Sequence, residues 1–442
     1  MALSSPTAPA TPRRWLAIVG IGEDGADGLS PVARSLISGV EIVFGGERHL
    51  ALAGALVRGE ARAWPSPFER GVTEVLAARG KRVCVLASGD PFHYGVGAVL
   101  ARHVDPAEML VLPAPSAFSL AAGQLGWALA GCALVSLHGR ALDLVRPHLQ
   151  PGARVLALTS DGAGPAALAR LLADTGFGDS RITALEALGG PRARVRTAPA
   201  AKFDLGEVDP LNVVAIEVVA APNARVIARA PGLADELFEH DGQITKREVR
   251  AMTLSALAPR RGELLWDIGA GAGSVAIEWM LADPSMRAVA IEAREDRAAR
   301  IARNAAALGV PGLVVMRGRA PDVLPSVIVR ESGRRSPGAP GVTGCPAFAE
   351  HDGESPDAIF VGGGCDDAVL DAAIAALRAG GRLVVNAVTL ETEALLIAQQ
   401  RERGGTLVRI AIERAEALGG MTAWRPALPV AQWCWSKPEA AP

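Results

Sequence analysis

The chain has 442 residues, of which 50% are hydrophobic and only 4% aromatic, and its formal net charge at pH 7 is −2. A chain of this length is too long for one hydrophobic core, so two or three domains are expected. The nearly balanced charge argues against a protein that binds nucleic acid over its whole surface, because such surfaces are usually basic.

The cysteines and the ends of the chain restrict the class of protein further. The five cysteines are Cys84, Cys132, Cys345, Cys365 and Cys434. None forms a C-x-x-C pair, so they predict neither a disulfide framework nor a metal site, and they suit a reducing cytoplasm. Residues 1–13 are rich in Ser, Pro, Ala and Thr, and we expect a disordered tail there. No apolar run reaches the length of a membrane span, so a cytoplasmic protein is expected.

The first globular unit is predicted over residues 14–225, as two subdomains of about 14–112 and 113–225. The apolar run 15–19 is typical of a buried parallel strand. Pro31 favours a helix over residues 31–38, since proline suits the first helical turn. Further strands are predicted at 40–44, 82–87, 109–112, 133–136, 153–158, 181–186 and 211–218, with helices between most of them.

A second unit is predicted over residues 241–437, after a linker at 226–240. Thr245 and Glu248 have the spacing of a capping box, so a helix is expected to follow them. The predicted strands are 263–268, 287–292, 312–317, 357–361, 381–386, 406–412 and 429–435, and the predicted helices are 274–282, 294–308, 321–329, 366–378 and 390–402. This alternation predicts an α/β fold with a doubly wound parallel sheet and an antiparallel end.

Residues 330–356 interrupt this pattern, since they are rich in Gly, Pro and Ser and lack hydrophobic periodicity. A structureless loop of this length is usually functional or disordered. We expect a flexible insertion without chemistry of its own.

The most specific pattern is a glycine-rich loop in which Asp267 precedes Gly269, Gly271 and Gly273. Glycine lets the backbone turn sharply and lets a ligand approach it closely. The helix that follows offers unpaired N–H groups at its N-terminus. Glu292 ends the next predicted strand, where an acidic residue can meet the hydroxyls of a ribose. The loop is therefore predicted to bind a nucleoside.

The glycine spacing indicates which nucleoside. A dinucleotide loop would have its third glycine at position 274, which is Ser274. The pattern Asp-x-Gly-x-Gly-x-Gly instead resembles motif I of the class I S-adenosylmethionine-dependent methyltransferases. This resemblance implies that S-adenosylmethionine is the cofactor and that a Rossmann-like domain binds it. The implied contacts are Asp267, Gly269, Ala270, Gly271, Ala272, Gly273 and Glu292.

Four stretches of the N-terminal half resemble the tetrapyrrole (corrin and porphyrin) methylases. They are Val19–Gly22, Leu86–Gly95, Pro113–Ala122 and Ser136–Arg140, of which Ser-Gly-Asp-Pro at 88–91 is the most specific. The resemblance implies two α/β subdomains with a second S-adenosylmethionine in the cleft between them. The implied contacts of this second site are Gly20, Gly22, Gly89, Asp90, Ser116, Ala117 and His138. The loop after the first strand has Glu23 and Asp24 where many relatives have Pro and Gly. In this respect the chain resembles the branch of the family that acts late in corrin synthesis.

The C-terminal half resembles the partner decarboxylating corrin methyltransferases. The likeness is carried by residues 245–250, 318–321, 361–364, 386–391 and 426–430. It adds Thr245, Arg319 and Ala320 to the cofactor site, with the backbone of Ala320 favoured as the donor, since Arg319 stands where relatives often have Asp. The candidate substrate contacts are Asp90, Arg247, Arg250, Arg319 and Asn386. Arginine suits the carboxylates of such a substrate, although Arg247 and Arg250 could equally be solvated charges on a helix.

In this order the two halves resemble the fused decarboxylating corrin methyltransferases of cobalamin biosynthesis. The resemblance implies an enzyme that methylates carbon 5 (N-terminal half) and carbon 15 (C-terminal half) of precorrin-6B and decarboxylates a ring acetate, giving precorrin-8. Its partners would be a polycarboxylate corrin precursor and further copies of the chain, with no nucleic acid or membrane. Three alternatives stay open: a catalytically silent half that only binds the macrocycle, a cobalt-bearing substrate, and a methyltransferase for RNA or another small molecule.

Overall fold

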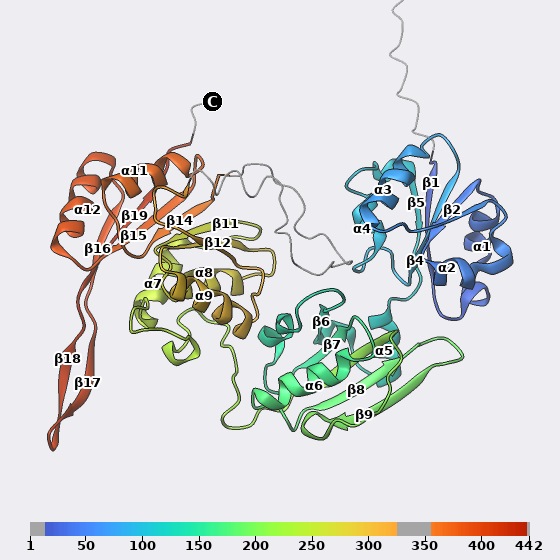
Figure 1. Cartoon of the computed structure of the whole chain (residues 1–442), viewed down its shortest axis with the longest axis horizontal. Coiled ribbons are helices and arrows are strands. Elements are labelled where there is room, and N and C mark those ends of the chain that lie inside the picture. The colour runs from blue at the N-terminus through green and yellow to red at the C-terminus, as the bar shows by residue number, and fades with distance from the viewer. Residues whose placement is uncertain (1–13, 325–354, 440–442) are drawn as a thin grey trace, which may run out of the picture. The chain divides into compact units, whose positions relative to one another are not determined.

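The computed structural model describes residues 14–324 and 355–439, which form two compact units (Figure 1). One unit consists mainly of residues 14–224 and the other mainly of residues 225–324 and 355–439. The predicted tail 1–13, almost all of the predicted insertion 330–356 and most of the predicted helix 321–329 lie outside the described residues. Within the described ranges, no helix is long and apolar enough to cross a membrane.

The first subdomain is built on a parallel sheet with the strand order β3-β2-β4-β1-β5. Its strands are β1 (Leu16–Ile21), β2 (Ile42–Gly45), β3 (Glu60–Ala63), β4 (Val83–Ser88) and β5 (Met109–Leu112), and its helices are α1 (Pro31–Ser38), α2 (Glu47–Ala53), α3 (Phe68–Ala77) and α4 (Val96–Leu100). Separate apolar clusters cover the two sheet faces, with Ile18 in one cluster and Val19 in the other. Strand β1 is therefore buried on both faces, as its continuous apolar run predicts.

The second subdomain has a mixed sheet with the order β6-β7-β10-β8-β9. Its strands are β6 (Cys132–Ser136), β7 (Arg154–Leu158), β8 (Arg181–Glu186), β9 (Arg194–Pro199) and β10 (Asn212–Glu217), and its α-helices are α5 (Ala117–Leu125) and α6 (Gly164–Asp174). Strands β6 and β7 are parallel, whereas β10 runs antiparallel to β7 and β8, and β9 antiparallel to β8.

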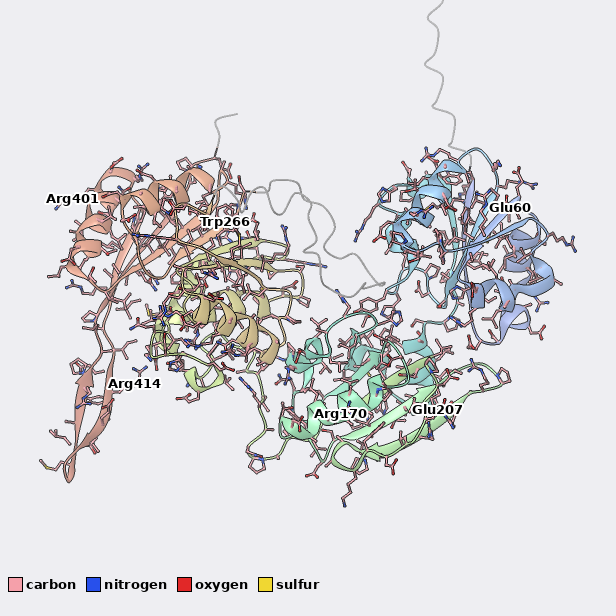
Figure 2. The ribbon with its side chains drawn as sticks, viewed as in Figure 1. Glu60, Arg170, Glu207, Trp266, Arg401 and Arg414 are labelled. Atoms are coloured by element: carbon pink, nitrogen blue, oxygen red, sulfur yellow. The ribbon has the colours of Figure 1, made fainter. Side chains whose placement is uncertain are left out.

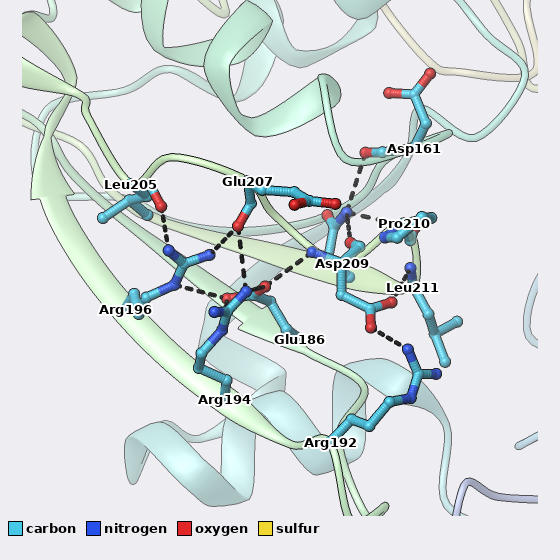
Figure 3. A network of polar contacts seen from close by, with 11 residues as sticks. Asp161, Glu186, Arg192, Arg194, Arg196, Leu205, Glu207, Asp209, Pro210 and Leu211 are labelled. Atoms are coloured by element: carbon cyan, nitrogen blue, oxygen red, sulfur yellow. Dashed lines mark hydrogen bonds and ion pairs between the residues drawn. The ribbon is translucent and has the colours of Figure 1, made fainter.

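A buried carboxylate fastens the edge of this second sheet (Figure 3). Glu186, at the end of β8, accepts hydrogen bonds from Arg194 at 2.6 Å, from Arg196 at 2.9 Å and from the backbone N–H of Asp209 at 2.8 Å. Burial alone would raise the pKa of Glu186, but these hydrogen bonds lower it to about 2. The network therefore ties the edge strand β9 and the segment before β10 to the end of β8.

The C-terminal unit has a seven-stranded sheet with the order β13-β12-β11-β14-β15-β19-β16. Its strands are β11 (Leu264–Ile268), β12 (Arg287–Glu292), β13 (Val314–Arg317), β14 (Ala358–Val361), β15 (Arg382–Ala387), β16 (Thr406–Ile410) and β19 (Val430–Ser436). Only β19 runs antiparallel to its neighbours, β15 and β16. The predicted doubly wound parallel sheet with an antiparallel end is confirmed.

Helices cover both faces of this sheet. They are α7 (Arg247–Leu257), α8 (Ser274–Leu281), α9 (Glu295–Ala307), α11 (Asp367–Ala376) and α12 (Leu390–Arg403). One apolar cluster joins α7, α8 and α9 to the sheet through Leu254, Trp279 and Ile301, and the other joins α11 and α12 through Leu370 and Leu396.

A hairpin of β17 (Glu413–Leu418) and β18 (Met421–Pro426) is inserted between β16 and β19. It projects from the C-terminal unit (Figure 1), and Figure 2 places Arg414 on it, in contrast to the fully buried Trp266 of the sheet. No strand was predicted between the strands 406–412 and 429–435.

The predicted linker 226–240 is packed against the C-terminal unit. Its residues Ile227, Leu233 and Phe238 are buried in the same apolar cluster as the helices α7, α8 and α9. The backbone N–H groups of Gly232 and Leu233 donate to the carboxylate of Glu278 on α8, at 2.7 and 2.9 Å. The segment predicted as a linker is thus packed as part of the C-terminal unit.

Candidate functional site

The glycine-rich loop connects β11 to α8 and forms a cradle for a ligand. Gly269, Gly271 and Gly273 all have positive φ, at 70°, 59° and 75°. A Cβ on Gly269 would lie 2.6 Å from the Gly363 carbonyl oxygen, and one on Gly273 would lie 2.7 Å from Ile301. A Cβ on Gly271 would meet only the Gln243 carbonyl oxygen, at 3.4 Å. Packing therefore requires glycine at the two outer positions, whereas the middle one leaves room for a ligand.

Glu292 ends β12 beside this loop. One oxygen of its buried carboxylate accepts a hydrogen bond from the N–H of Gly271 at 2.9 Å, and the other accepts from the N–H of Arg294 at 2.9 Å. An ionised carboxylate has about four acceptor positions, so two remain for a ligand. Glu292 can hold the loop and accept hydroxyl groups at the same time.

Asp267, in β11 directly before the loop, is almost fully buried. Its Oδ2 accepts a hydrogen bond from the N–H of Ala276 at 3.1 Å, while its Oδ1 has no partner among the described residues. Burial, helped by the negative charge of Glu292, raises the pKa of Asp267 to about 7. Such an unpaired buried acceptor fits a polar ligand group in the cradle.

The segment before α7 runs beside the loop, since Gln243 approaches Gly271. Thr245 in this segment is half-buried. The predicted capping box of Thr245 and Glu248 is wrong, because Lys246 occupies the N-cap without a side-chain hydrogen bond. Glu248 forms an ion pair with Arg414 of the hairpin instead.

The turn after β13 lies on the other side of Glu292. The N–H of Gly318 donates to the Glu292 carbonyl at 3.0 Å. Ala320 is half-buried, and Arg319 is exposed, as is Arg247 on α7. The backbone of this turn is thus joined to Glu292, and the Arg319 side chain is open to solvent.

Arg250 cannot contact a substrate, and that prediction is wrong. Its side chain is fully buried and donates to Glu278 at 2.5 Å, to Asp235 at 3.0 Å and to the carbonyl oxygens of Leu233 and Thr245. These bonds attach the segment before α7 to the helix pair α7 and α8.

Asn386 lies near the carboxyl end of β15 and is almost buried. Its side-chain N–H donates to Thr253 at 3.0 Å, and its oxygen accepts from Gln432 at 2.9 Å. Gln432 also donates to Thr253, at 3.1 Å. The amide is therefore held in one orientation at the edge where ligands of such sheets bind.

The first three motifs of the N-terminal unit meet at the ends of β1 and β4. A Cβ on Gly20 would lie 1.9 Å from the Gly89 carbonyl oxygen, and one on Gly89, whose φ is +55°, would lie 2.7 Å from the Pro115 carbonyl oxygen. Next to Gly20, a Cβ on Gly22 would lie 2.6 Å from Asp24. Three chain segments thus approach one another closely enough that only glycine fits.

The polar residues of these motifs have local partners. Asp90 accepts a hydrogen bond from the N–H of Phe92 at 2.8 Å. Ser116 caps α5 by accepting from the N–H of Ser119 at 3.1 Å, and Ala117 is the first residue of that helix. His138 is exposed, and its Nδ1 lies 3.2 Å from the carbonyl oxygen of Thr159. These bonds leave backbone groups as the principal contacts that Ser116 and Ala117 can offer.

Arg48 and His49 lie in the first turn of α2, after the end of β2, and belong to none of the motifs identified in the sequence. Both side chains lie within hydrogen-bonding distance of Ser88, the residue before Gly89. The available signal was a polar pair that follows the predicted strand 40–44 after two glycines and Glu47. Within the described ranges, no three His, Cys, Asp or Glu side chains are grouped so that they could hold a metal ion.

Comparison with known proteins adds a family to each half. Residues 16–204 match the tetrapyrrole (corrin/porphyrin) methylases, and residues 236–330 and 338–437 match the precorrin methyltransferase domain.

The chain is similar to curated proteins along nearly its whole length. It is 58% identical over 438 residues to a precorrin-6Y C(5,15)-methyltransferase [decarboxylating] of Sinorhizobium sp., covering 99% of this chain and 100% of the relative. It is 40% identical over 426 residues to the protein of that name from Mycobacterium tuberculosis (strain CDC 1551 / Oshkosh), covering 95% and 99%. The crystal structure of the C-terminal domain of precorrin-6Y C5,15-methyltransferase from Rhodobacter capsulatus is 42% identical, with 48% of this chain and 100% of that chain covered and a TM-score of 0.40.

Proposed function

The chain belongs to the decarboxylating precorrin-6Y C(5,15)-methyltransferases, and we propose that each of its two units performs one of the two methylations. It is an S-adenosylmethionine-dependent enzyme of cobalamin biosynthesis that methylates carbons 5 and 15 of precorrin-6B and decarboxylates a ring acetate. The observation that supports two sites is that each unit has glycines at the carboxyl ends of parallel strands, Gly20 and Gly89 at the ends of β1 and β4 and Gly269–Gly273 after β11.

The proposal assigns carbon 5 to residues 14–225 and carbon 15, with the decarboxylation, to residues 241–437. The match of the first range to the tetrapyrrole methylases and of the second to the precorrin methyltransferase domain supports this division.

In the C-terminal unit, S-adenosylmethionine would lie against the Gly269–Gly273 loop. The bound cofactor would supply an activated methyl group on its sulfonium. Glu292 would accept the ribose hydroxyls, while Asp267 holds the start of α8 through its bond to Ala276. Thr245 and the backbone N–H of Ala320 would contact the cofactor from the two flanking segments. Together these groups orient the donor and keep water out, which is what an in-line methyl transfer requires.

In the N-terminal unit, the cofactor would contact Gly20, Gly22 and Gly89 through their backbones. Asp90 would line the cleft where the macrocycle enters. Ser116, Ala117 and His138 would contribute from the second subdomain, mainly through backbone groups, because the Ser116 hydroxyl already caps α5.

The substrate carries several carboxylates, and exposed cations suit them. Arg247 and Arg319 are the exposed candidates beside the C-terminal site, and Asn386 offers a fixed amide. In the decarboxylation, the bond between the acetate methylene and its carboxylate breaks, and the electron pair enters the conjugated macrocycle as carbon dioxide leaves. A proton taken up from water then converts the methylene into a methyl group, and the protein would assist by placing the departing carboxylate away from these cations.

The proposal includes a homo-oligomer held by the β17–β18 hairpin. Large apolar side chains on and beside it are strongly exposed: Leu418 at 62%, Met421 at 77%, Trp424 at 70% and Leu428 at 75%. An isolated two-stranded hairpin is only marginally stable in water, so packing against another copy would stabilise it.

The four described cysteines are free thiols, which suits the cytoplasmic location that we propose.

Two measurements test the two-site proposal. Calorimetric titration of the purified chain with S-adenosylhomocysteine should give two sites per chain. Mass spectrometry of the product should show a gain of two methyl groups and the loss of one carbon dioxide. A single binding site would instead favour one active half with a silent, macrocycle-binding half.

A further inference from the structure

Arg48, His49 and Ser88 come together at one edge of the first parallel sheet. Arg48 and His49 lie in the first turn of α2, after β2, and Ser88 is the last residue of β4, which pairs with β2. Ligands of open α/β sheets bind at the carboxyl ends of the strands. Ser88 also directly precedes Gly89, one of the glycines proposed to contact the cofactor of the N-terminal unit.

The three side chains form a triangle of hydrogen-bonding atoms. The Ser88 Oγ lies 2.8 Å from Nη2 of Arg48 and 2.7 Å from Nε2 of His49, and the two nitrogens are 3.0 Å apart. The backbone N–H of Gly46 donates to Nδ1 of His49 at 3.3 Å. This bond favours the neutral tautomer with its proton on Nε2, in which Nη2 of Arg48 and Nε2 of His49 can both donate to the serine oxygen.

This pattern determines what Ser88 can do. Because its oxygen accepts two hydrogen bonds, its own hydroxyl hydrogen is directed away from Arg48 and His49, and the residue is exposed. In the tautomer favoured by the Gly46 N–H, Nε2 of His49 donates to Ser88, so the hydroxyl hydrogen of Ser88 is left for another acceptor. Burial, helped by the charge of Arg48, lowers the pKa of His49 to about 4, so the ring is neutral at physiological pH.

Charged neighbours fix the position of Arg48. Its guanidinium forms an ion pair with Glu23, in the loop after β1. Glu23 also lies 3.4 Å from Arg192 of the second subdomain, which is paired in turn with Asp209 (Figure 3). The charges of the two arginines are therefore balanced by those of Glu23 and Asp209. Groups from both subdomains thus fix the position of Arg48 beside Ser88.

We propose that Ser88 donates its hydroxyl hydrogen bond to a carboxylate of the macrocycle at the N-terminal site, with Arg48 and His49 as positioning residues. Only an acceptor can use this hydrogen, and the acidic arms of the substrate are acceptors next to the Arg48 cation. The inference rests on the proposed function, because it assumes that the N-terminal unit performs a methylation.

The test compares Ser88→Ala with Ser88→Thr in the full-length enzyme. Methyl transfer from ¹³C-methyl S-adenosylmethionine, resolved by NMR, separates methylation at carbon 5 from that at carbon 15. Ser88→Ala should raise KM for the macrocycle at carbon 5 roughly tenfold or more, the usual effect of losing a hydrogen bond to a charged group. It should leave kcat at carbon 5, the rate at carbon 15 and S-adenosylhomocysteine affinity within about twofold, and Ser88→Thr should restore KM. The matched control is Ser35→Ala, at an exposed serine on α1.

A double-mutant cycle tests the positioning role. His49→Ala alone should raise KM, but in the Ser88→Ala background it should add little, because the group it positions is gone. An unchanged KM for Ser88→Ala, or a loss that falls on cofactor affinity instead, would overturn the inference while two cofactor sites per chain still uphold the proposed function. A wild-type enzyme whose single cofactor site lies in the C-terminal unit would overturn both.

Discussion

Glu292 and Gly271 are joined by a hydrogen bond of 2.9 Å from the backbone N–H of the glycine to the carboxylate. The bond connects the end of β12 to the middle of the loop between β11 and α8, at the one loop glycine that leaves room for a ligand. The carboxylate that orders the loop is therefore the one proposed to accept the ribose, so loop order and cofactor binding depend on the same side chain.

Replacement of this carboxylate should weaken the C-terminal cofactor site selectively. Charge-assisted hydrogen bonds contribute roughly 1.5–3 kcal/mol, so Glu292→Ala should lower the affinity for S-adenosylhomocysteine there about ten- to a hundredfold. Glu292→Asp should lose less if the loop can shift toward it. Calorimetry should show one weakened and one unchanged site.

A deoxy cofactor separates the two tasks of Glu292. The 2′-deoxy analogue should bind the wild-type C-terminal site poorly, because a hydroxyl donor is missing. It should lose little further affinity in Glu292→Ala, where the acceptor is already absent. Equal discrimination against the analogue in both proteins would show that the carboxylate orders the loop without touching the ribose.

Gly271→Val should abolish cofactor binding at the C-terminal site while the chain stays folded. The new side chain would enter the space left for the ligand, and the positive φ would cost about 1–2 kcal/mol, less than the stability of a typical domain. Methylation at carbon 5, measured with substrate that is already decarboxylated, should survive. Gly273→Val is the comparison, because its Cβ would collide with Ile301 at 2.7 Å and should reduce stability as well. Loss of both methylations in a folded Gly271→Val protein would contradict the two-site proposal.

Most strands could be predicted from sequence, whereas the two exposed edge strands β3 and β9 could not. β1, β4, β11 and β14 are buried over most or all of their lengths and appear as continuous apolar runs. The edge strands β3 and β9 are largely exposed and rich in Ala and Arg, so no apolar pattern indicated them. The segment 226–240 has the composition of a linker, but its few apolar residues are enough to pack it against the C-terminal unit.

The site was predictable where it is local in sequence. The Asp267–Gly273 loop and Glu292 lie on neighbouring strands, so spacing alone indicated their proximity. Arg250 was misread because its partner Glu278 is on another helix, and nothing in the spacing shows that both are buried together. Arg48 and His49 were missed because Ser88, which they contact, is brought beside them only by the pairing of β2 with β4.

The packing of residues 226–240 predicts at which residue a stable fragment of the C-terminal unit should begin. A fragment of residues 225–442 should be more stable than one of residues 241–442, which lacks Ile227, Leu233 and Phe238. Each of these three buried side chains contributes roughly 1.5–3 kcal/mol, so the shorter fragment should lose about 4.5–9 kcal/mol or unfold. Urea unfolding followed by circular dichroism measures the difference, and equal midpoints would show that the segment adds no stability.

The hairpin predicts the assembly state. Trp424→Ser combined with Leu418→Ser and Met421→Ser should convert the oligomer to a monomer, because exposed apolar side chains would no longer stabilise contacts between copies. Light scattering after size exclusion measures the mass, and S-adenosylhomocysteine affinity should stay unchanged. The control is Val32→Ser, since Val32 is an exposed apolar residue on α1. A wild-type monomer would overturn the proposed oligomer, and an unchanged mass in the triple variant would exclude these side chains as its contact.

Asp267 predicts how the stability of the cofactor-free chain depends on pH. Burial raises the pKa of Asp267 from 3.8 to about 7, so the folded chain keeps a proton that the unfolded chain releases. Its contribution is therefore present below pH 3.8 and is lost as the pH rises through about 7. Asp267→Asn cannot ionise, so in urea unfolding between pH 4 and 7 the wild type should lose up to about 1.4 kcal/mol per pH unit relative to the variant. His49, whose pKa is lowered to about 4, acts with the opposite sign but is present in both proteins, so it cancels. Parallel curves would mean that Asp267 is already ionised throughout this range.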